Sequence, residues 1–281
     1  MFAKRHCYTQ TTLITHYPYY FTADHRRILT VVTTSPKTLS KWLTDLLKST
    51  AKGTPNHNPI LVGFSAEYDV VRYTKRGVKD LPYDIVTLCV GSQCIVYHFD
   101  TRHSEYGPRN LTNKTLRDFL ENPKIAAVGM NMDVACERME RHHGIKIKNA
   151  IDLRALVYET LMKKKKDKCM DEEEEEEVVL DVGRYNLDKV AVKVLGKEFE
   201  VARPQKKKKK VEWYASDGGK RCYFWYWRRQ LRLEKVQFVT VDAHLCFLVG
   251  SKCYDMIHGS VTEEVIGNSI KKNVKREKMK I

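Results

Sequence analysis

Polar and acidic residues at the end of an apolar segment are the first sign of chemistry in this sequence. Residues 60–69 begin with apolar side chains that predict a buried strand and end with Ser65, Glu67 and Asp69. Because side chains alternate faces along a strand, these three point the same way if the strand continues. A carboxylate at the end of a buried strand is costly without a partner, and a metal ion is a common partner. This segment is therefore a candidate site.

Two more carboxylates lie next to or within predicted elements. Asp133 follows the apolar segment 124–130, at the start of a predicted helix. Asp242 lies within another predicted helix near the end of the chain. Carboxylates are hard oxygen ligands of the kind that Mg²⁺ prefers.

The order of the predicted elements indicates an α/β domain with a mixed sheet. Strands are expected over 60–66, 85–90 and 94–99, and the short turn at 91–93 predicts a hairpin between the last two. Segment 124–130 is continuously apolar, which is typical of a strand buried in parallel pairing. Helices are expected over about 35–47, 113–120, 132–143, 153–161, 185–196 and 234–249.

Composition divides the chain into three parts. Residues 1–34 are interpreted as an N-terminal extension with strands, 35–250 as the main domain, and 251–281 as a basic tail that is expected to be disordered. Within the main domain, 162–182 is a low-complexity insertion of lysine and glutamate runs. A second insert, 218–230, is basic and aromatic.

The order of these motifs resembles the 3'-5' exonuclease domain of the RNase H-like superfamily. Within it, the resemblance is to the type with a Tyr in its third motif, called DEDDy, which includes Werner-type and RNase D-like enzymes and the plant Werner-syndrome-like exonucleases. It runs from about residue 30 to 250 and implies a mixed central sheet flanked by helices. The segments that carry it are LVGF (61–64), FLENPKIAAVGMNMDVACERME (119–140), IDLRAL (151–156) and EKVQFVTVDAHLCFLVG (234–250).

The resemblance implies a catalytic site. Such enzymes use four carboxylates to hold two Mg²⁺ or Mn²⁺ ions, which activate a water and stabilise the leaving oxygen of a phosphodiester. Glu67, Asp133 and Asp242 match three of these carboxylates and are therefore implied metal ligands. Ser65 stands where the family has its first Asp, and Phe238 stands where it has the Tyr that orients the attacking water.

The two departures predict impaired catalysis. A serine is neutral and a poor bridging ligand, and Phe238 keeps the aromatic ring but lacks the hydroxyl. Asp69 could compensate for Ser65 only if the end of the strand shifted by one pleat, about 6–7 Å. Asp152 matches a family position that is usually structural, and we interpret it as a cap of the helix that follows.

Segment 218–230 has two interpretations. Its rings and guanidinium groups, including Trp225, Trp227, Arg228 and Arg229, would suit a stacking platform for single-stranded bases. Alternatively, the insert is a loosely packed loop or an artefact of gene prediction.

Charge points to a polyanionic partner. The formal net charge is +15, which favours single-stranded DNA or RNA, although lysine runs can also serve only to solubilise loops. No run of about 18 apolar residues is present, so no membrane span is expected. Lysine runs such as 206–210 would suit nuclear import, and we expect the nucleus, the cytoplasm or both. The 8 cysteines form no C-x-x-C pair and are expected to be reduced.

Three functional hypotheses follow. The first is a metal-dependent 3'-5' exonuclease acting on single-stranded ends, with activity reduced by Ser65 and Phe238. The second is a pseudo-exonuclease that binds nucleic acid without cutting it. The third is a homo-oligomeric scaffold on the same fold, since some plant members of the resembled family form rings.

Overall fold

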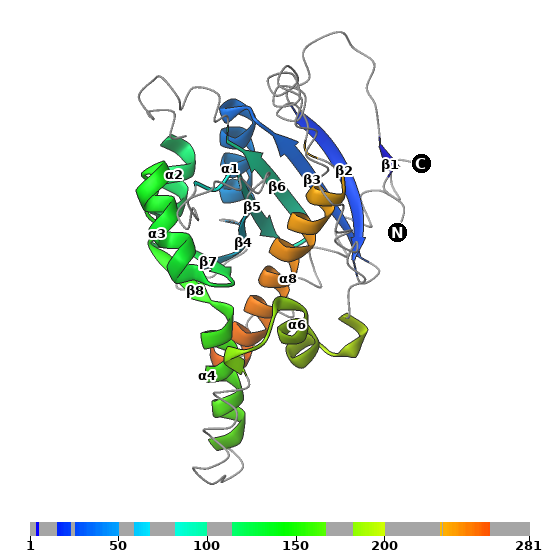
Figure 1. Ribbon diagram of the computed structural model, residues 1–281, viewed down its shortest axis with the longest axis vertical. Helices are drawn as coiled ribbons and strands as arrows, with labels where there is room; N and C mark the ends of the chain where they lie inside the picture. The colour runs from blue at the N-terminus through cyan, green and yellow to red at the C-terminus, as the bar shows by residue number, and fades with distance from the viewer. Residues whose placement is uncertain are drawn as a thin grey trace, which may run out of the picture.

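An eight-stranded sheet forms the centre of the protein, in the order β1-β2-β3-β6-β5-β4-β7-β8 (Figure 1). The computed structural model describes residues 4–5, 16–23, 26–50, 59–67, 82–99, 114–166, 182–199, 231 and 233–258. The strands are β1 (Lys4–Arg5), β2 (His16–Ala23), β3 (Arg26–Thr33), β4 (Ile60–Glu67), β5 (Ile85–Val90), β6 (Gln93–His98), β7 (Ile125–Gly129) and β8 (Asn149–Asp152).

The sheet is mixed, which confirms the predicted fold class. β5 pairs antiparallel with both β4 and β6, whereas β4, β7 and β8 pair in parallel. The predicted hairpin is present as β5 and β6, joined by Gly91 and Ser92, and Gly91 has a φ of 59° that suits a glycine in a tight turn. β7 is fully buried and parallel to both of its neighbours, as its apolar sequence predicts.

The sheet extends into the N-terminal part of the chain. β3 pairs in parallel with β6, with Thr30 opposite Cys94, and β2 pairs antiparallel with β3. Residues 26–33, which the sequence analysis assigns to an N-terminal extension, are therefore a strand within the central sheet.

Helices cover both faces of the sheet (Figure 1). They are α1 (Pro36–Thr50), α2 (Lys114–Leu120), α3 (Met132–His143), α4 (Leu153–Lys166), α6 (Leu187–Leu195) and α8 (Leu233–His258), with a short 3-10 helix at Lys197–Phe199. No helix in the described segments is long and apolar enough to cross a membrane.

The last helix is longer than predicted. α8 continues through residues 251–258, which the sequence analysis assigned to a disordered tail, so the predicted boundary at 250 is corrected. The physical reason is packing: Cys253 is fully buried, and Met256 and Ile257 pack against the cluster formed with α4 and α6. The remainder of the predicted tail, 259–281, lies outside the described residues.

The alternation of β4 decides which side chains face α8. Val62 and Phe64 pack in the cluster with α1, α2 and α3 on one face of the sheet. Gly63 lies on the other face, where a Cβ atom would be 2.0 Å from the backbone oxygen of Ala243 in α8. Since Ser65 and Glu67 share the face of Gly63, β4 directs them toward α8.

Candidate functional site

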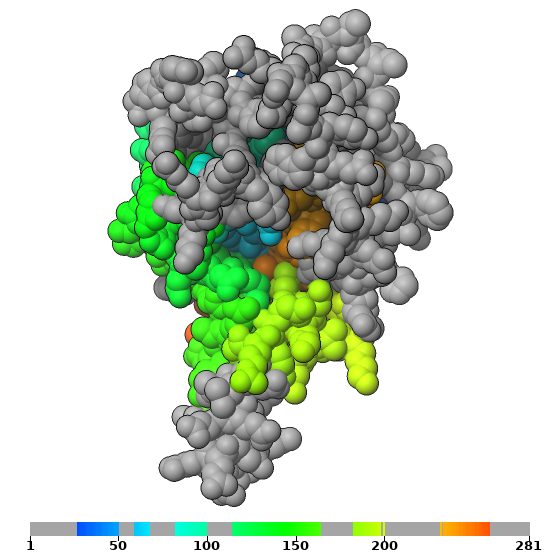
Figure 2. Space-filling view, viewed as in Figure 1, coloured from blue at the N-terminus to red at the C-terminus, as the bar shows by residue number. Residues whose placement is uncertain are grey.

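A cavity of about 910 Å³ opens where the carboxyl end of β4 meets α3 and α8. Figure 2 shows the corresponding hollow, with blue β4 and orange α8 at its floor between green α3 and yellow-green α6. Residues of all four elements line the cavity. The cavity therefore collects side chains that are far apart in the sequence.

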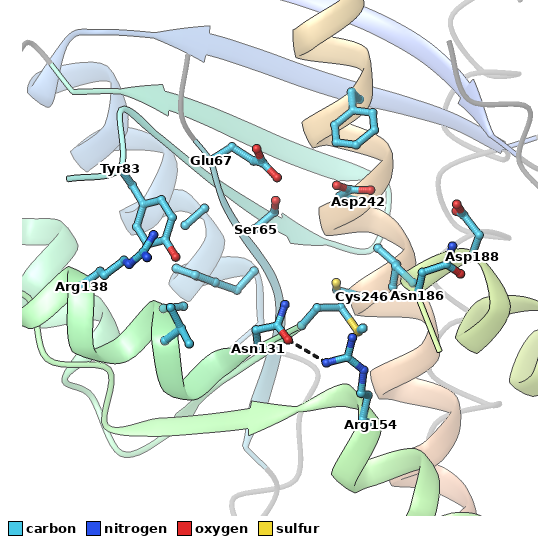
Figure 3. Close-up of a pocket in the computed structure, with 17 residues that line it drawn as sticks. Ser65, Glu67, Tyr83, Asn131, Arg138, Arg154, Asn186, Asp188, Asp242 and Cys246 are labelled. Atoms are coloured by element: carbon cyan, nitrogen blue, oxygen red, sulfur yellow. Dashed lines mark hydrogen bonds between the residues drawn. The ribbon is translucent and has the colours of Figure 1, made fainter. Parts of the chain in front are cut away.

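Four of the predicted site residues line this cavity together. Ser65 and Glu67 come from β4, and Phe238 and Asp242 come from α8, one helical turn apart. All four are half-buried. Figure 3 shows Ser65, Glu67 and Asp242 near the centre of the view, where β4 and α8 come together.

Asp133 does not join them. It lies exposed in the first turn of α3 and is not part of the cavity lining. The residues of α3 that line the cavity are Val134, Ala135 and Arg138. At about 100° per residue, Asp133 points away from the direction of Ala135 and Arg138. Sequence spacing places Asp133 correctly at the helix start but does not determine the rotation of the helix.

The remaining predicted residues lie outside the described segments. These are Asp69 and the proposed stacking residues Trp225, Trp227, Arg228 and Arg229.

Sequence reasoning missed several residues at this site, namely Lys235 and the lining residues Tyr83, Arg138 and Arg154. The Nζ of Lys235 lies 3.1 Å from Oε2 of Glu67, and the two side chains are 25% and 36% exposed. The same ammonium lies 5.9 Å from the ring centroid of Phe238, within the range of a cation–π contact. Lys235 precedes Phe238 by three positions and Asp242 by seven, so helical periodicity could have placed it on the same face.

A tyrosine and an arginine line another part of the cavity. The guanidinium carbon of Arg138 lies 5.6 Å from the ring centroid of Tyr83, and Tyr83 is only 8% exposed. Burial raises the pKa of the Tyr83 hydroxyl, and the negative charge of Glu67 raises it further. Tyr83 therefore stays neutral to a higher pH than an ordinary tyrosine does.

Asp152 caps two helices and is not part of the cavity lining. Its Oδ2 accepts a hydrogen bond from the Met132 backbone N at 3.0 Å, and its Oδ1 accepts one from the Arg154 backbone N at 2.9 Å. One carboxylate thus caps the first turns of both α3 and α4, which agrees with its predicted structural role and extends it to a second helix.

The capped helix α4 presents Arg154 to the cavity. Its Nε donates to the Tyr185 carbonyl at 3.0 Å, and its Nη1 donates to Asn131 Oδ1 at 2.7 Å, which is the dashed line in Figure 3. Asn131 itself adopts a left-handed conformation with φ 53° just before α3. These contacts hold a permanent positive charge at the cavity wall.

The donor set does not fit a two-metal centre. Mg²⁺ requires several hard oxygen ligands in near-octahedral geometry. Here Ser65 is neutral, Glu67 is paired with Lys235, and Asp133 lies outside the lining. Within the described segments, no group of three or more His, Cys, Asp and Glu residues could hold a metal ion.

No family model matches the sequence, and no curated protein matches it. Among solved structures, the chain is similar to the catalytic core of RRP6 from Trypanosoma brucei, with a TM-score of 0.46 and 14% identity. It is also similar to the EXD2 exonuclease domain, with a TM-score of 0.35 and 15% identity, and to RNase D from Trypanosoma brucei, with 0.49 and 14%.

These likenesses span most of this chain. They cover 80% of it for RRP6 and 83% for both EXD2 and RNase D. The chain in turn spans 46% of the RRP6 chain, 97% of the EXD2 chain and 66% of the RNase D chain.

Proposed function

We propose that this chain is a 3'-5' exonuclease-family protein that binds the ends of single-stranded DNA or RNA in the β4–α8 cavity, with impaired phosphodiester hydrolysis. The observation that carries the proposal is the meeting of Ser65, Glu67, Phe238 and Asp242 in one cavity. The resembled family has Asp, Glu, Tyr and Asp at these four positions, which supports matching the cavity to the catalytic site of that family.

The finer family assignment is to the DEDDy type, near the plant Werner-syndrome-like exonucleases. It rests on the order of the four matching segments and on the separation of four residues between Phe238 and Asp242. Binding of Mg²⁺ or Mn²⁺ is weak in this proposal, because Ser65 supplies no charge and Glu67 is paired with Lys235.

The cavity suits a terminal nucleotide. Small-molecule pockets have volumes of about 300–1,000 Å³, and a cavity of about 910 Å³ lies within that range. Arg138 and Arg154 line it, and guanidinium groups bind phosphate oxygens in a planar, bidentate manner. The formal net charge of +15 would attract the rest of the strand.

A purely non-catalytic role is the second candidate, and the Lys235–Glu67 pair favours it. In this version the protein is a pseudo-exonuclease that holds nucleic acid ends or acts as a homo-oligomeric scaffold. Sedimentation of the purified protein with and without a single-stranded oligonucleotide separates the two: a scaffold assembles without nucleic acid, whereas an end-binding protein need not.

Location in the nucleus, the cytoplasm or both is a further proposal, based on the lysine runs such as 206–210. Imaging of a fluorescent fusion, compared with a fusion in which that run is replaced by alanine and serine, tests it. Exclusion of the intact fusion from both compartments would contradict it.

Binding to ends is tested by fluorescence anisotropy with linear and circular single-stranded DNA. A linear competitor is expected to displace a labelled oligonucleotide, whereas a circular one of equal length is much weaker because it has no end. Arg138→Met should weaken binding by about tenfold, since hydrogen bonds to charged groups contribute about 1.5–3 kcal/mol.

Arg141→Met is the matched control, because Arg141 lies on the same helix but is exposed and paired with Glu137. Equal competition by circular DNA, or equal effects of Arg138→Met and Arg141→Met, would show that the cavity does not bind strand ends.

A further inference from the structure

Lys235 occupies an unfavourable place for a cation unless it has a specific partner. It lies near the start of α8, where the aligned peptide dipoles favour negative charge. Its ammonium nevertheless reaches Oε2 of Glu67 at 3.1 Å and the face of Phe238 at 5.9 Å. The contacts across to β4, rather than the helix itself, therefore explain the position of this charge.

The pair changes the charge balance of the cavity. Among the described residues, its lining contains three carboxylates, from Glu67, Asp188 and Asp242, and two guanidinium groups, from Arg138 and Arg154. Lys235 is not a lining residue, but its ion pair with Glu67 adds a third positive charge next to this set, so that the described positive and negative formal charges are equal. A site with four uncompensated carboxylates needs divalent ions before a phosphate can approach, whereas this one does not.

A divalent ion would also have to compete with Lys235. Glu67 is the only carboxylate that β4 contributes to the cavity, because Ser65 supplies a hydroxyl at the neighbouring position on the same face. An ion bound at Oε2 would lie within a few ångströms of the ammonium, where like charges in a half-buried site repel strongly. Either the lysine or the ion can occupy this position, and the lysine is tethered there.

We infer that Lys235, which is not itself part of the lining but is held on the lining residue Glu67, is the resident cation beside this cavity and makes the binding of a nucleotide phosphate independent of divalent metal ions. The inference rests on the proposed function and deepens it. The ammonium neutralises Glu67 and offers its remaining N–H donors to a phosphate oxygen, as lysine does at other phosphate sites. Arg138 and Arg154 complete the set of cations around the ligand.

The test measures oligonucleotide and GMP binding to the full chain by anisotropy and competition, in excess EDTA and in millimolar Mg²⁺. Wild-type affinity is expected to be the same in both within about twofold. Lys235→Met keeps the aliphatic stem and removes the charge, and it should lose about tenfold or more in EDTA. Lys252→Met is the matched control, because Lys252 is exposed on the same helix outside the cavity, and it should bind like wild type.

Lys235→Arg separates charge from local structure. It keeps a cation at the same place and should retain most of the binding affinity in EDTA. If Lys235 had only a structural role, both Lys235→Arg and Lys235→Met would lose affinity. Circular dichroism melts of all three variants show whether each is folded before its binding is compared.

The binding results in EDTA and in Mg²⁺ test the resident-cation inference separately from the proposed function. If the wild type binds only with Mg²⁺, or if Lys235→Met binds in EDTA as well as wild type, the resident-cation inference is wrong and the proposed function stands. If the wild type binds neither oligonucleotide nor GMP in either condition, the proposed function itself fails.

A direct metal measurement provides an independent readout. Electron paramagnetic resonance of Mn²⁺ titrated into the protein should show no site in the wild type at micromolar ion, because Lys235 holds Glu67. Stoichiometric Mn²⁺ binding by the wild type in that range would overturn the inference.

Discussion

The packing of β4 against α8 depends on the absence of a side chain at Gly63, and this gives a sharp test of how the site is assembled. An added Cβ would lie 2.0 Å from the backbone oxygen of Ala243 and 2.7 Å from the backbone nitrogen of Phe247. Real Cβ atoms do not approach so closely, so Gly63→Ala must push α8 away from the strand.

The size of the effect follows from the kind of atoms involved. Extra methyl or methylene groups in a packed core cost about 1–3 kcal/mol when side chains can adjust. Here the nearest atoms are backbone, which no rotamer change can move, so we expect a loss near the top of that range, about 3 kcal/mol. For a large domain each kcal/mol lowers Tm by about 2–4 °C, which gives a fall of about 6–12 °C.

Urea unfolding and thermal melts monitored by circular dichroism measure this loss. Gly183→Ala is the matched control, since a Cβ there has no neighbour within 4 Å. That variant should be neutral or stabilised by about 0.4–1 kcal/mol through the unfolded chain. If Gly63→Ala unfolds within about 0.5 kcal/mol of wild type, the close contact between β4 and α8, and with it the geometry of the cavity, is wrong.

Three further predictions concern individual residues. Asp152→Ala removes the caps of two helices and should cost about 2 kcal/mol in urea unfolding, with Asp152→Asn losing about half as much; a loss below about 0.5 kcal/mol for the alanine variant would contradict the double cap. The pKa of Tyr83 is higher in the folded protein than in the unfolded chain, where it is about 10. Neutral Tyr83 therefore contributes fully to the free energy of unfolding below the unfolded-state pKa, and this contribution is lost as pH rises through the folded-state pKa. Tyr83→Phe should therefore lose less stability than wild type between pH of about 9 and 11, and parallel pH profiles of unfolding would refute this. Ser65→Asp adds a carboxylate beside Glu67 and should tighten Mn²⁺ binding by about tenfold in a paramagnetic-resonance titration, whereas unchanged binding would show that the two side chains do not share the site.

The strands around the site could be predicted because their signals are local. The apolar run before Ser65, the hairpin turn at Gly91 and the continuous apolar segment of β7 each specify an element with little help from distant residues. α3 likewise ends at His143, as the predicted range 132–143 expects, and Gly144 follows with φ 60° and its N–H donating to the Glu140 carbonyl at 3.0 Å.

The composition of the cavity could be predicted only in part. The resemblance identifies Ser65, Glu67, Phe238 and Asp242, which the fold brings together. It could not show that α3 is rotated so that Asp133 lies outside the lining, since helix rotation is set by tertiary packing of residues such as Met132, Ala135 and Met139.

The role of Lys235 could not be predicted from its residue type. A lysine in the first turn of a helix is ordinarily a solvated surface charge, and only the distance of 3.1 Å to Glu67 gives it a role. The length of α8 is a similar case, because residues 251–258 are held in the helix by contacts with α4 and α6 that no local pattern specifies.

Whether the cavity binds strand ends without efficient cutting is measured by a strand-shortening assay on 5'-labelled single-stranded DNA and RNA, run in Mg²⁺ and in Mn²⁺ with binding measured on the same samples. We expect the wild type to bind the strands but to shorten them little or not at all, close to the Glu67→Gln/Asp242→Asn variant. Extensive shortening of the bound strands from the 3' end by the wild type, abolished in that double variant, would contradict the proposed impairment and show a fully working exonuclease at the same cavity.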